Sequence, residues 1–217
     1  MAGVQRLAVL LLALTCVIAP QATRAADAPV KMVVLGDSLS AGYGLPGQDA
    51  FPAKLAKALE AKGVAVAMTN AGVSGDTASG GLGRLDWSVP EGTQAVIVEL
   101  GANDALRGID PKVTRTALDG ILKKLKDRKI AVLLAGMYAP RNLGPDYVRD
   151  FDGIYPELAK TYDAILYPFF LDGVAGDDKL NQRDGLHPTA PGIDIIVERI
   201  MPKVEELMAR AKSARGS

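Results

Sequence analysis

The stretch that decides the fold is Lys31-Met-Val-Val-Leu-Gly-Asp-Ser-Leu-Ser40. Within it, Val33 to Leu35 form an apolar run that does not alternate with polar residues and that stops at Gly36. Such a run is typical of a strand covered on both faces, as in the centre of a parallel sheet. Ser38 follows where the chain leaves the carboxyl end of this strand, which is the edge where open α/β sheets bind ligands. The stretch therefore predicts a buried central strand with a candidate nucleophile at its end.

Similar apolar runs recur along the chain, with helical stretches and short connections between them. The five predicted strands are Met32–Leu35, Val64–Met68, Ala95–Leu100, Ile130–Ala135 and Ala164–Tyr167. Strand and helix units in series imply a parallel sheet with right-handed crossovers and helices on both faces. We predict one domain over residues 27–217, an α/β fold built as a three-layer α/β/α sandwich with a five-stranded parallel sheet of flavodoxin-like topology.

Caps and prolines predict where the helices begin and end. Asp49 and Asp110 are candidate N-caps, and Pro111 stands at the first helical position after the second of them. Pro156 is expected to interrupt a helix, because proline lacks the backbone N–H. Pro202 should kink the last helix without ending it, since the apolar stripe continues in phase beyond it.

Three connections are long for a compact α/β domain: residues 72–83, 136–146 and 172–188. Each of them follows a predicted strand, so that all three lie at the same edge of the sheet as Ser38. Connections longer than usual are often functional. This edge is therefore the expected place of a binding or catalytic site.

Residues 1–26 differ in composition from the rest of the chain. Arg6 precedes an apolar stretch over residues 7–19, and small residues end it at Ala25 or Ala26. This pattern is typical of a secretory signal peptide, and the apolar stretch is too short for a stable membrane anchor. We expect a periplasmic or secreted mature protein. Cys16 is the only cysteine, so removal of this segment would leave no thiol for catalysis, disulfides or metal binding.

The chain has 217 residues and a formal net charge of +0, without a block of like charges. This balance gives no indication of nucleic acid or of an anionic membrane surface as a partner. The expected partner is a small molecule, bound by a monomer.

The single histidine, His187, narrows the possible chemistry. It stands in Asp184-Gly-Leu-His-Pro188. A serine hydroxyl is a weak nucleophile until a base takes its proton, and imidazole is the usual base. A tight turn through Gly185 could bring the Asp184 carboxylate to the far ring nitrogen. Alternatively, His187 is a surface loop residue, but its position at the same edge as Ser38 favours the catalytic interpretation.

Acyl transfer also needs hydrogen-bond donors directed at the developing oxyanion. Gly72, after the second strand, could bring its N–H close to a ligand, and Asn103, after the third strand, offers a side-chain amide. Each signal is weak alone, because Gly72 could serve only a turn and Asn103 could cap a helix. Both residues are expected at the same edge of the sheet as Ser38, which favours their role as oxyanion donors.

Four ordered blocks now resemble a known family. They are Gly36-Asp-Ser-Leu39, Gly72 within Asn70-Ala-Gly-Val-Ser74, Gly101-Ala-Asn-Asp104 and Asp184-Gly-Leu-His187. In this order they are similar to the blocks of the SGNH or GDSL hydrolases, in particular the secreted thioesterase I, lysophospholipase L1 and arylesterase group. The resemblance extends over nearly the whole chain.

The resemblance implies a role for each matched residue. Ser38 would be the nucleophile, His187 the base and then the acid, and Asp184 the group that orients the ring. The backbone N–H groups of Ser38 and Gly72 and the Asn103 side chain would form the oxyanion hole. No cofactor and no metal would be needed. Ala102, where the family often has glycine, adds a methyl group beside this hole.

Substrate contacts are expected from the neighbours of Ser38 and from one loop. Asp37 and Leu39 flank the nucleophile, and Tyr138 and Pro140 lie in the largely apolar loop 136–146. This loop could wall the acyl site or be passive. The substrate class stays open among aryl esters, acyl thioesters, lysophospholipids and acetylated carbohydrates.

Other classes of protein fit the sequence less well. The α/β-hydrolases place their serine in G-x-S-x-G, which the context of Ser38 does not match. A flavodoxin-like binding module would need a phosphate cradle, and 36–38 is too short and too acidic for one. Residues 172–178 lack the spacing of a calcium loop of the EF-hand type.

Overall fold

The computed structural model describes residues 28–214, and the predicted signal peptide therefore lies outside the described residues. Five strands form one sheet in the order β2-β1-β3-β4-β5, and every neighbouring pair is parallel. The strands are β1 Val30–Gly36, β2 Val66–Gly72, β3 Ala95–Glu99, β4 Ala131–Ala135 and β5 Ile165–Tyr167. The predicted α/β fold with a five-stranded parallel sheet is confirmed.

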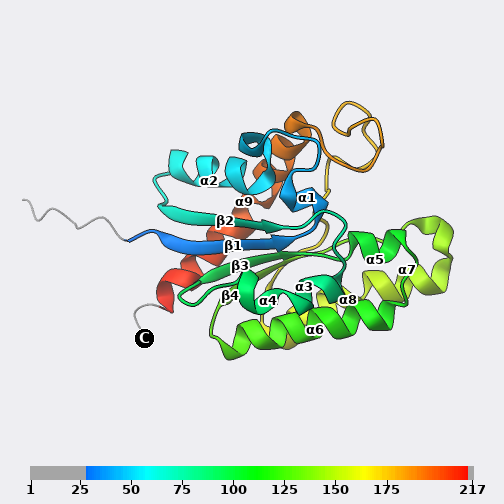
Figure 1. Cartoon of the computed structure of the whole chain (residues 1–217), viewed down its shortest axis with the longest axis horizontal. Helices are drawn as coiled ribbons and strands as arrows, with labels where there is room; N and C mark the ends of the chain where they lie inside the picture. The colour runs from blue at the N-terminus through cyan, green and yellow to red at the C-terminus, as the bar shows by residue number, and fades with distance from the viewer. Residues whose placement is uncertain (1–27, 215–217) are drawn as a thin grey trace, which may run out of the picture.

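Helices cover both faces of the sheet (Figure 1). α2 and α9 pack on one face, and α3, α6 and α8 lie on the other. The helices are α1 Ser38–Ala41, α2 Phe51–Ala61, α3 Ala78–Gly83, α4 Leu85–Ser88, α5 Ala102–Leu106, α6 Pro111–Asp127, α7 Pro145–Asp152, α8 Ile154–Tyr162 and α9 Ala190–Ser213, with 3-10 turns at Gly47–Asp49 and Arg141–Leu143. None of the helices within residues 28–214 is long and apolar enough to cross a membrane.

The core is centred on β1 and β3. Every residue of β3 is buried, and in β1 only Lys31 is exposed, as the unbroken apolar runs predict. β2 is an edge strand with exposed residues, and it pairs with β1 as far as Gly36↔Gly72. The predicted Val64–Met68 was therefore placed too early, because an edge strand needs no continuous apolar run.

The helix boundaries agree with the sequence in part. Asp110 accepts a hydrogen bond from the N–H of Lys112 and caps α6, as predicted. Asp49 caps nothing, because it lies in a 3-10 turn and α2 begins after Ala50. The interruption expected at Pro156 occurs earlier, at Gly153 between α7 and α8, since a proline in the first turn of a helix costs no hydrogen bond. α9 continues through Pro202.

The register places the carboxyl ends of the strands at one edge. Gly36 lies beside Gly72 and Glu99, and Ala135 lies beside Glu99 and Tyr167. The strand ends and the loops that follow them carry every block that the sequence singles out. The segment 172–178 forms local contacts: Asp172 pairs with Arg199, and Asp177 accepts the N–H of Lys179. Residues 28–214 contain no group of three His, Cys, Asp or Glu side chains that could share a metal ion.

Candidate active site

Ser38 begins α1, directly after β1. The carboxylate of Asp37 caps this helix by accepting the N–H of Leu39 at 3.0 Å. Gly42 ends the helix in a left-handed conformation, with φ of +84°. The strand and the one-turn helix thus fix the position of Ser38 at the carboxyl edge of the sheet.

A chain of hydrogen bonds connects Ser38, His187 and Asp184. Nε2 of His187 lies 2.9 Å from Oγ of Ser38, and Nδ1 lies 2.6 Å from Oδ2 of Asp184. Because a carboxylate only accepts, Nδ1 carries the ring proton and Nε2 is left to accept the serine hydroxyl. The structure therefore brings together the three residues that the sequence selected.

A tight turn holds Asp184 beneath the ring. Oδ1 accepts the N–H groups of Leu186 at 2.9 Å and of His187 at 3.0 Å, and Gly185 has φ of +69°. The hydrogen bonds from the N–H groups of His187 and Leu186 and from the His187 ring lower the pKa of Asp184 to about 2. The carboxylate is thus ionised wherever imidazole chemistry operates.

The loop that carries His187 is attached to the loop after Ser38. Gln182 donates from its backbone N–H to the carbonyl of His187 at 2.7 Å and from Nε2 to the carbonyl of Tyr43 at 2.8 Å. The ring of Tyr43 lies against the His187 ring, with the centroids 4.5 Å apart. Gln182 and Tyr43, which the sequence reasoning missed, therefore connect the two halves of the site.

An apolar cleft of about 460 Å³ opens beside Ser38 and His187. Its walls come from the loops after all five strands, and the apolar lining includes Leu39, Leu106, Met137, Tyr138, Phe169 and Leu186. Tyr138 stacks on Phe169 with centroids 4.6 Å apart. Leu39, Tyr138 and Pro140, which the sequence selected as substrate contacts, all line this cleft.

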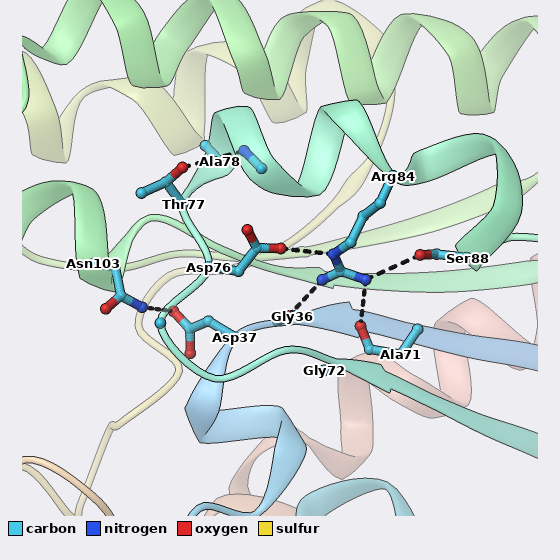
Figure 2. Close-up of polar contacts among 12 residues, drawn as sticks. Gly36, Asp37, Ala71, Gly72, Asp76, Thr77, Ala78, Arg84, Ser88 and Asn103 are labelled. Atoms are coloured by element: carbon cyan, nitrogen blue, oxygen red, sulfur yellow. Dashed lines mark hydrogen bonds and ion pairs between the residues drawn. The ribbon is translucent and has the colours of Figure 1, made fainter.

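Asp37 does not line the cleft. It is fully buried, and its carboxylate accepts the N–H of Leu39 and, at 3.1 Å, the side-chain amide of Asn103 (Figure 2). Its expected contact with substrate does not agree with this placement. The residue instead holds Asn103, which lies in α5 and lines the cleft. One hydrogen of the amide is bound to Asp37, and the second is left for a ligand.

Gly72 is also placed differently from the prediction. Its N–H donates to Oδ1 of Asn70 at 2.9 Å, and it is absent from the lining of the cleft. A Cβ at this position would lie 2.4 Å from the backbone nitrogen of Ala41, so the glycine allows α1 to approach β2. The prediction of Gly72 as an oxyanion donor therefore does not fit the geometry.

Gly75, in the same loop, lies at the cleft together with Ser74. It has φ of +82°, which favours glycine, and its carbonyl accepts a hydrogen bond from Arg107 at 2.8 Å. Its N–H has no acceptor among residues 28–214. The sequence did not distinguish the two glycines, because the predicted strand ended at Met68 and both lie beyond it, whereas in the structure Gly72 is the last residue of β2.

A second carboxyl group lies under the nucleophile. Glu99 is fully buried, and its Oε2 accepts the hydroxyl of Ser40 at 2.7 Å and the N–H of Asp37 at 3.4 Å. Burial raises the pKa of Glu99 well above its ordinary value, and the nearby Asp37 raises it further. Burial also raises the pKa of Asp37, to about 6. The turn at Ser38 thus rests on two buried carboxyl groups.

The fold and this site define a hydrolase with a serine, histidine and aspartate at the carboxyl edge of a parallel sheet. A family model described as GDSL-like Lipase/Acylhydrolase family matches residues 34–195. The chain belongs to this family, as the four sequence blocks indicated.

Individual relatives of known name are consistent with this family assignment. The chain is 41% identical over 165 residues to an arylesterase of Vibrio mimicus, covering 76% of this chain and 82% of that protein. It is 38% identical over 178 residues to thioesterase 1/protease 1/lysophospholipase L1 of Escherichia coli, covering 82% and 84%. The crystal structure of AlinE4, an SGNH-hydrolase family esterase, matches with a TM-score of 0.70 and 48% identity, covering 82% of this chain and 96% of that one.

Proposed function

We propose that this chain is a serine esterase that cleaves carboxylic esters and thioesters through an acyl-enzyme on Ser38. The observation that carries the proposal is the chain of hydrogen bonds from Ser38 through His187 to Asp184, at 2.9 and 2.6 Å, beside an apolar cleft. The arylesterase and thioesterase among the relatives support the same reaction class.

The geometry supports the following steps. Nε2 of His187 takes the hydroxyl proton as Oγ of Ser38 attacks the ester carbonyl carbon, and Asp184 stabilises the imidazolium that forms. The same Nε2 then gives its proton to the departing alcohol or thiol, which leaves the acyl group on Ser38. Water, activated by His187, attacks the acyl-enzyme in turn and releases the acid.

We assign the oxyanion hole to the N–H groups of Ser38 and Gly75 and the side-chain amide of Asn103. Gly75 replaces Gly72 in this assignment, because Gly75 lines the cleft and has a free N–H whereas Gly72 donates to Asn70. Donors of this kind contribute about 100- to 1000-fold each in rate.

The cleft favours an apolar acyl or aryl group as the part of the substrate that it binds. Its lining of leucine, methionine and aromatic side chains offers a sugar few hydrogen-bond partners, which argues against an acetylated carbohydrate. A chain-length series of p-nitrophenyl esters, compared with palmitoyl-CoA, a lysophospholipid and an acetylated sugar, decides among the substrate classes. Higher kcat/KM for the acetylated sugar than for every apolar ester would contradict the proposal.

The mechanism is tested with Ser38→Ala and His187→Ala beside the wild type. Removing the nucleophile of such a triad costs about 10⁶-fold in kcat, so Ser38→Ala should lose ester hydrolysis and labelling by a fluorophosphonate probe. Ester hydrolysis by Ser38→Ala within about tenfold of the wild type would disprove the acyl-enzyme on Ser38.

We also propose that the protein acts outside the cytoplasm, after removal of residues 1–26, as a monomer. The composition of that segment supports export. The mass of the protein recovered from the periplasm or medium checks the cleavage, and light scattering of the purified protein checks the monomer.

A further inference from the structure

Arg84 is a buried cation close to the active site but outside the cleft. It stands between α3 and α4, is 7% exposed, and uses its guanidinium for four hydrogen bonds (Figure 2). Nε donates to Asp76 at 2.6 Å, Nη2 to the carbonyl of Gly36 at 2.8 Å, and Nη1 to the carbonyl of Ala71 at 2.8 Å and the hydroxyl of Ser88 at 3.0 Å.

These partners belong to the segments that build the site. Gly36 is the last residue of β1, two positions before Ser38, and Ala71 lies near the end of β2. Asp76 directly follows Gly75. One rigid, planar group therefore connects the strand that presents the nucleophile with the loop that presents the Gly75 N–H.

We propose that Arg84 is a positioning residue of the oxyanion hole, which sets the place of the Gly75 N–H relative to Oγ of Ser38. The inference rests on the proposed esterase function. Arg84 touches no cleft atom and acts through Asp76 and the strand ends. The contact from Arg107 to the carbonyl of Gly75 is exposed, so the buried pair of Arg84 and Asp76 is the firmer of the two supports.

The role has a kinetic signature. An oxyanion donor acts on the charge that develops in the transition state and contributes little to binding of the ground-state ester. A displacement of about 1 Å in such a group can cost about 100-fold in rate. Loss of the positioning group should therefore lower kcat and leave KM nearly unchanged, which a purely structural salt bridge would not do.

The test uses Arg84→Lys and Asp76→Asn in the full chain, assayed well below their melting temperatures. The readouts are kcat and KM for p-nitrophenyl butyrate and Ki for an alkylboronic acid, whose tetrahedral adduct on Ser38 places an oxygen in the oxyanion hole. Ki does not depend on the fraction of folded enzyme. We expect kcat to fall about 10- to 100-fold, Ki to rise by a similar factor and KM to stay within about threefold.

Arg128→Ala is the matched control. Arg128 also donates to two backbone carbonyls, those of Val89 and Pro90, but these precede β3 and lie at the opposite edge of the sheet. Its removal should lower the melting temperature and leave kcat and Ki within about twofold of the wild type.

One outcome would overturn the positioning role of Arg84, and a control separates it from a failure of the esterase mechanism. If Arg84→Lys, or Asp76→Asn should the first not fold, keeps kcat and Ki within about threefold of the wild type, the positioning role is wrong. Ser38→Ala in the same assay tests the esterase mechanism separately. If that mechanism is wrong, Ser38→Ala stays active; if only the role of Arg84 is wrong, Ser38→Ala is inactive.

Discussion

The two halves of the active site are held in different ways. The half with Ser38 rests on the core: Asp37, Ser40 and Glu99 are fully buried, and their hydrogen bonds join residues about 60 positions apart in the chain. The half with His187 lies on a surface loop, where 38% of the Asp184 side chain is exposed and its partners lie within three residues.

This difference predicts how substitutions act. Contacts that are local and exposed contribute little to the free energy of unfolding, whereas buried networks across strands contribute more. Changes in the His187 loop should therefore alter catalysis alone. Changes beneath Ser38 should alter stability, and they should alter catalysis as well where they break the contact that holds Asn103.

The largest effect expected from a conservative change is that of Asp184→Asn. An amide facing Nδ1 of His187 would donate to it and so move the ring proton to Nε2, which could then no longer accept the hydroxyl of Ser38. We expect kcat to fall by roughly 10³- to 10⁴-fold, with a melting temperature at neutral pH within about 2 °C of the wild type. Steady-state kinetics and thermal unfolding measure both.

The same variant has a pH signature. The pKa of Asp184 is lowered in the folded protein to about 2, so its contribution to stability is present above the ordinary carboxyl range and is lost as the pH falls toward 2. The difference in melting temperature between the wild type and Asp184→Asn should therefore shrink below pH 4. A large loss of stability at neutral pH would contradict the local character of this half.

A smaller loss of activity, with a change in stability, is expected for Asp37→Asn. In this variant an amide nitrogen replaces Oδ2, the atom that accepts the N–H of Asn103, and a nitrogen of this kind cannot accept. Asn103 should then rotate, so that its second N–H leaves the oxyanion hole. We expect kcat to fall about 10- to 100-fold and the melting temperature to change by more than that of Asp184→Asn.

Comparison across pH sharpens this prediction. The pKa of Asp37 is about 6, so the wild type itself becomes neutral at this position as the pH falls through that value. The ratio of the wild-type kcat to that of Asp37→Asn should therefore fall toward 1 below pH 6. Titrations that are common to both enzymes cancel in this ratio. A ratio that is constant from pH 5 to pH 8 would show that the charge of Asp37 has no part in holding Asn103.

The sequence selected the three hydrogen-bonded side chains of Ser38, His187 and Asp184 correctly, but it did not reveal most of the residues that hold them in place. Ser38, Asp184 and His187 follow from chemistry and short spacing: there is one histidine, one carboxylate three residues before it and one strand-end serine. The sheet followed from unbroken apolar runs, which the burial of β1 and β3 confirms. Local patterns of this kind can be recognised in the sequence without a structure.

The errors occurred where long-range packing decides. Gly72 was selected as a backbone donor and Gly75 was not considered, and only the approach of α1 to β2 shows that Gly72 serves packing. Arg84, Gln182 and Glu99 carry no motif, because each has at least one hydrogen-bond partner, a backbone carbonyl or a hydroxyl, that lies far away in the chain. Such contacts leave no periodicity or spacing in the sequence.

The smallest effect is expected for Glu99→Gln, which separates stability from catalysis within the buried half. The pKa of Glu99 is raised in the folded protein, so folding binds a proton there and stability falls as the pH rises above the ordinary glutamate range. Gln keeps the oxygen that accepts from Ser40, and its amide takes the place of Oε1, which has no partner among residues 28–214.

At pH 4, where both side chains are neutral, the two proteins should melt within about 1 °C of each other; at pH 8 the variant should melt higher by roughly 2–4 °C. Thermal unfolding across this range measures the difference, and activity should stay within about threefold, because Asp37 and Asn103 keep their contact. A variant that melts lower than the wild type at pH 8 would mean that Glu99 is ionised in the folded protein and stabilises the Ser38 turn as a charge.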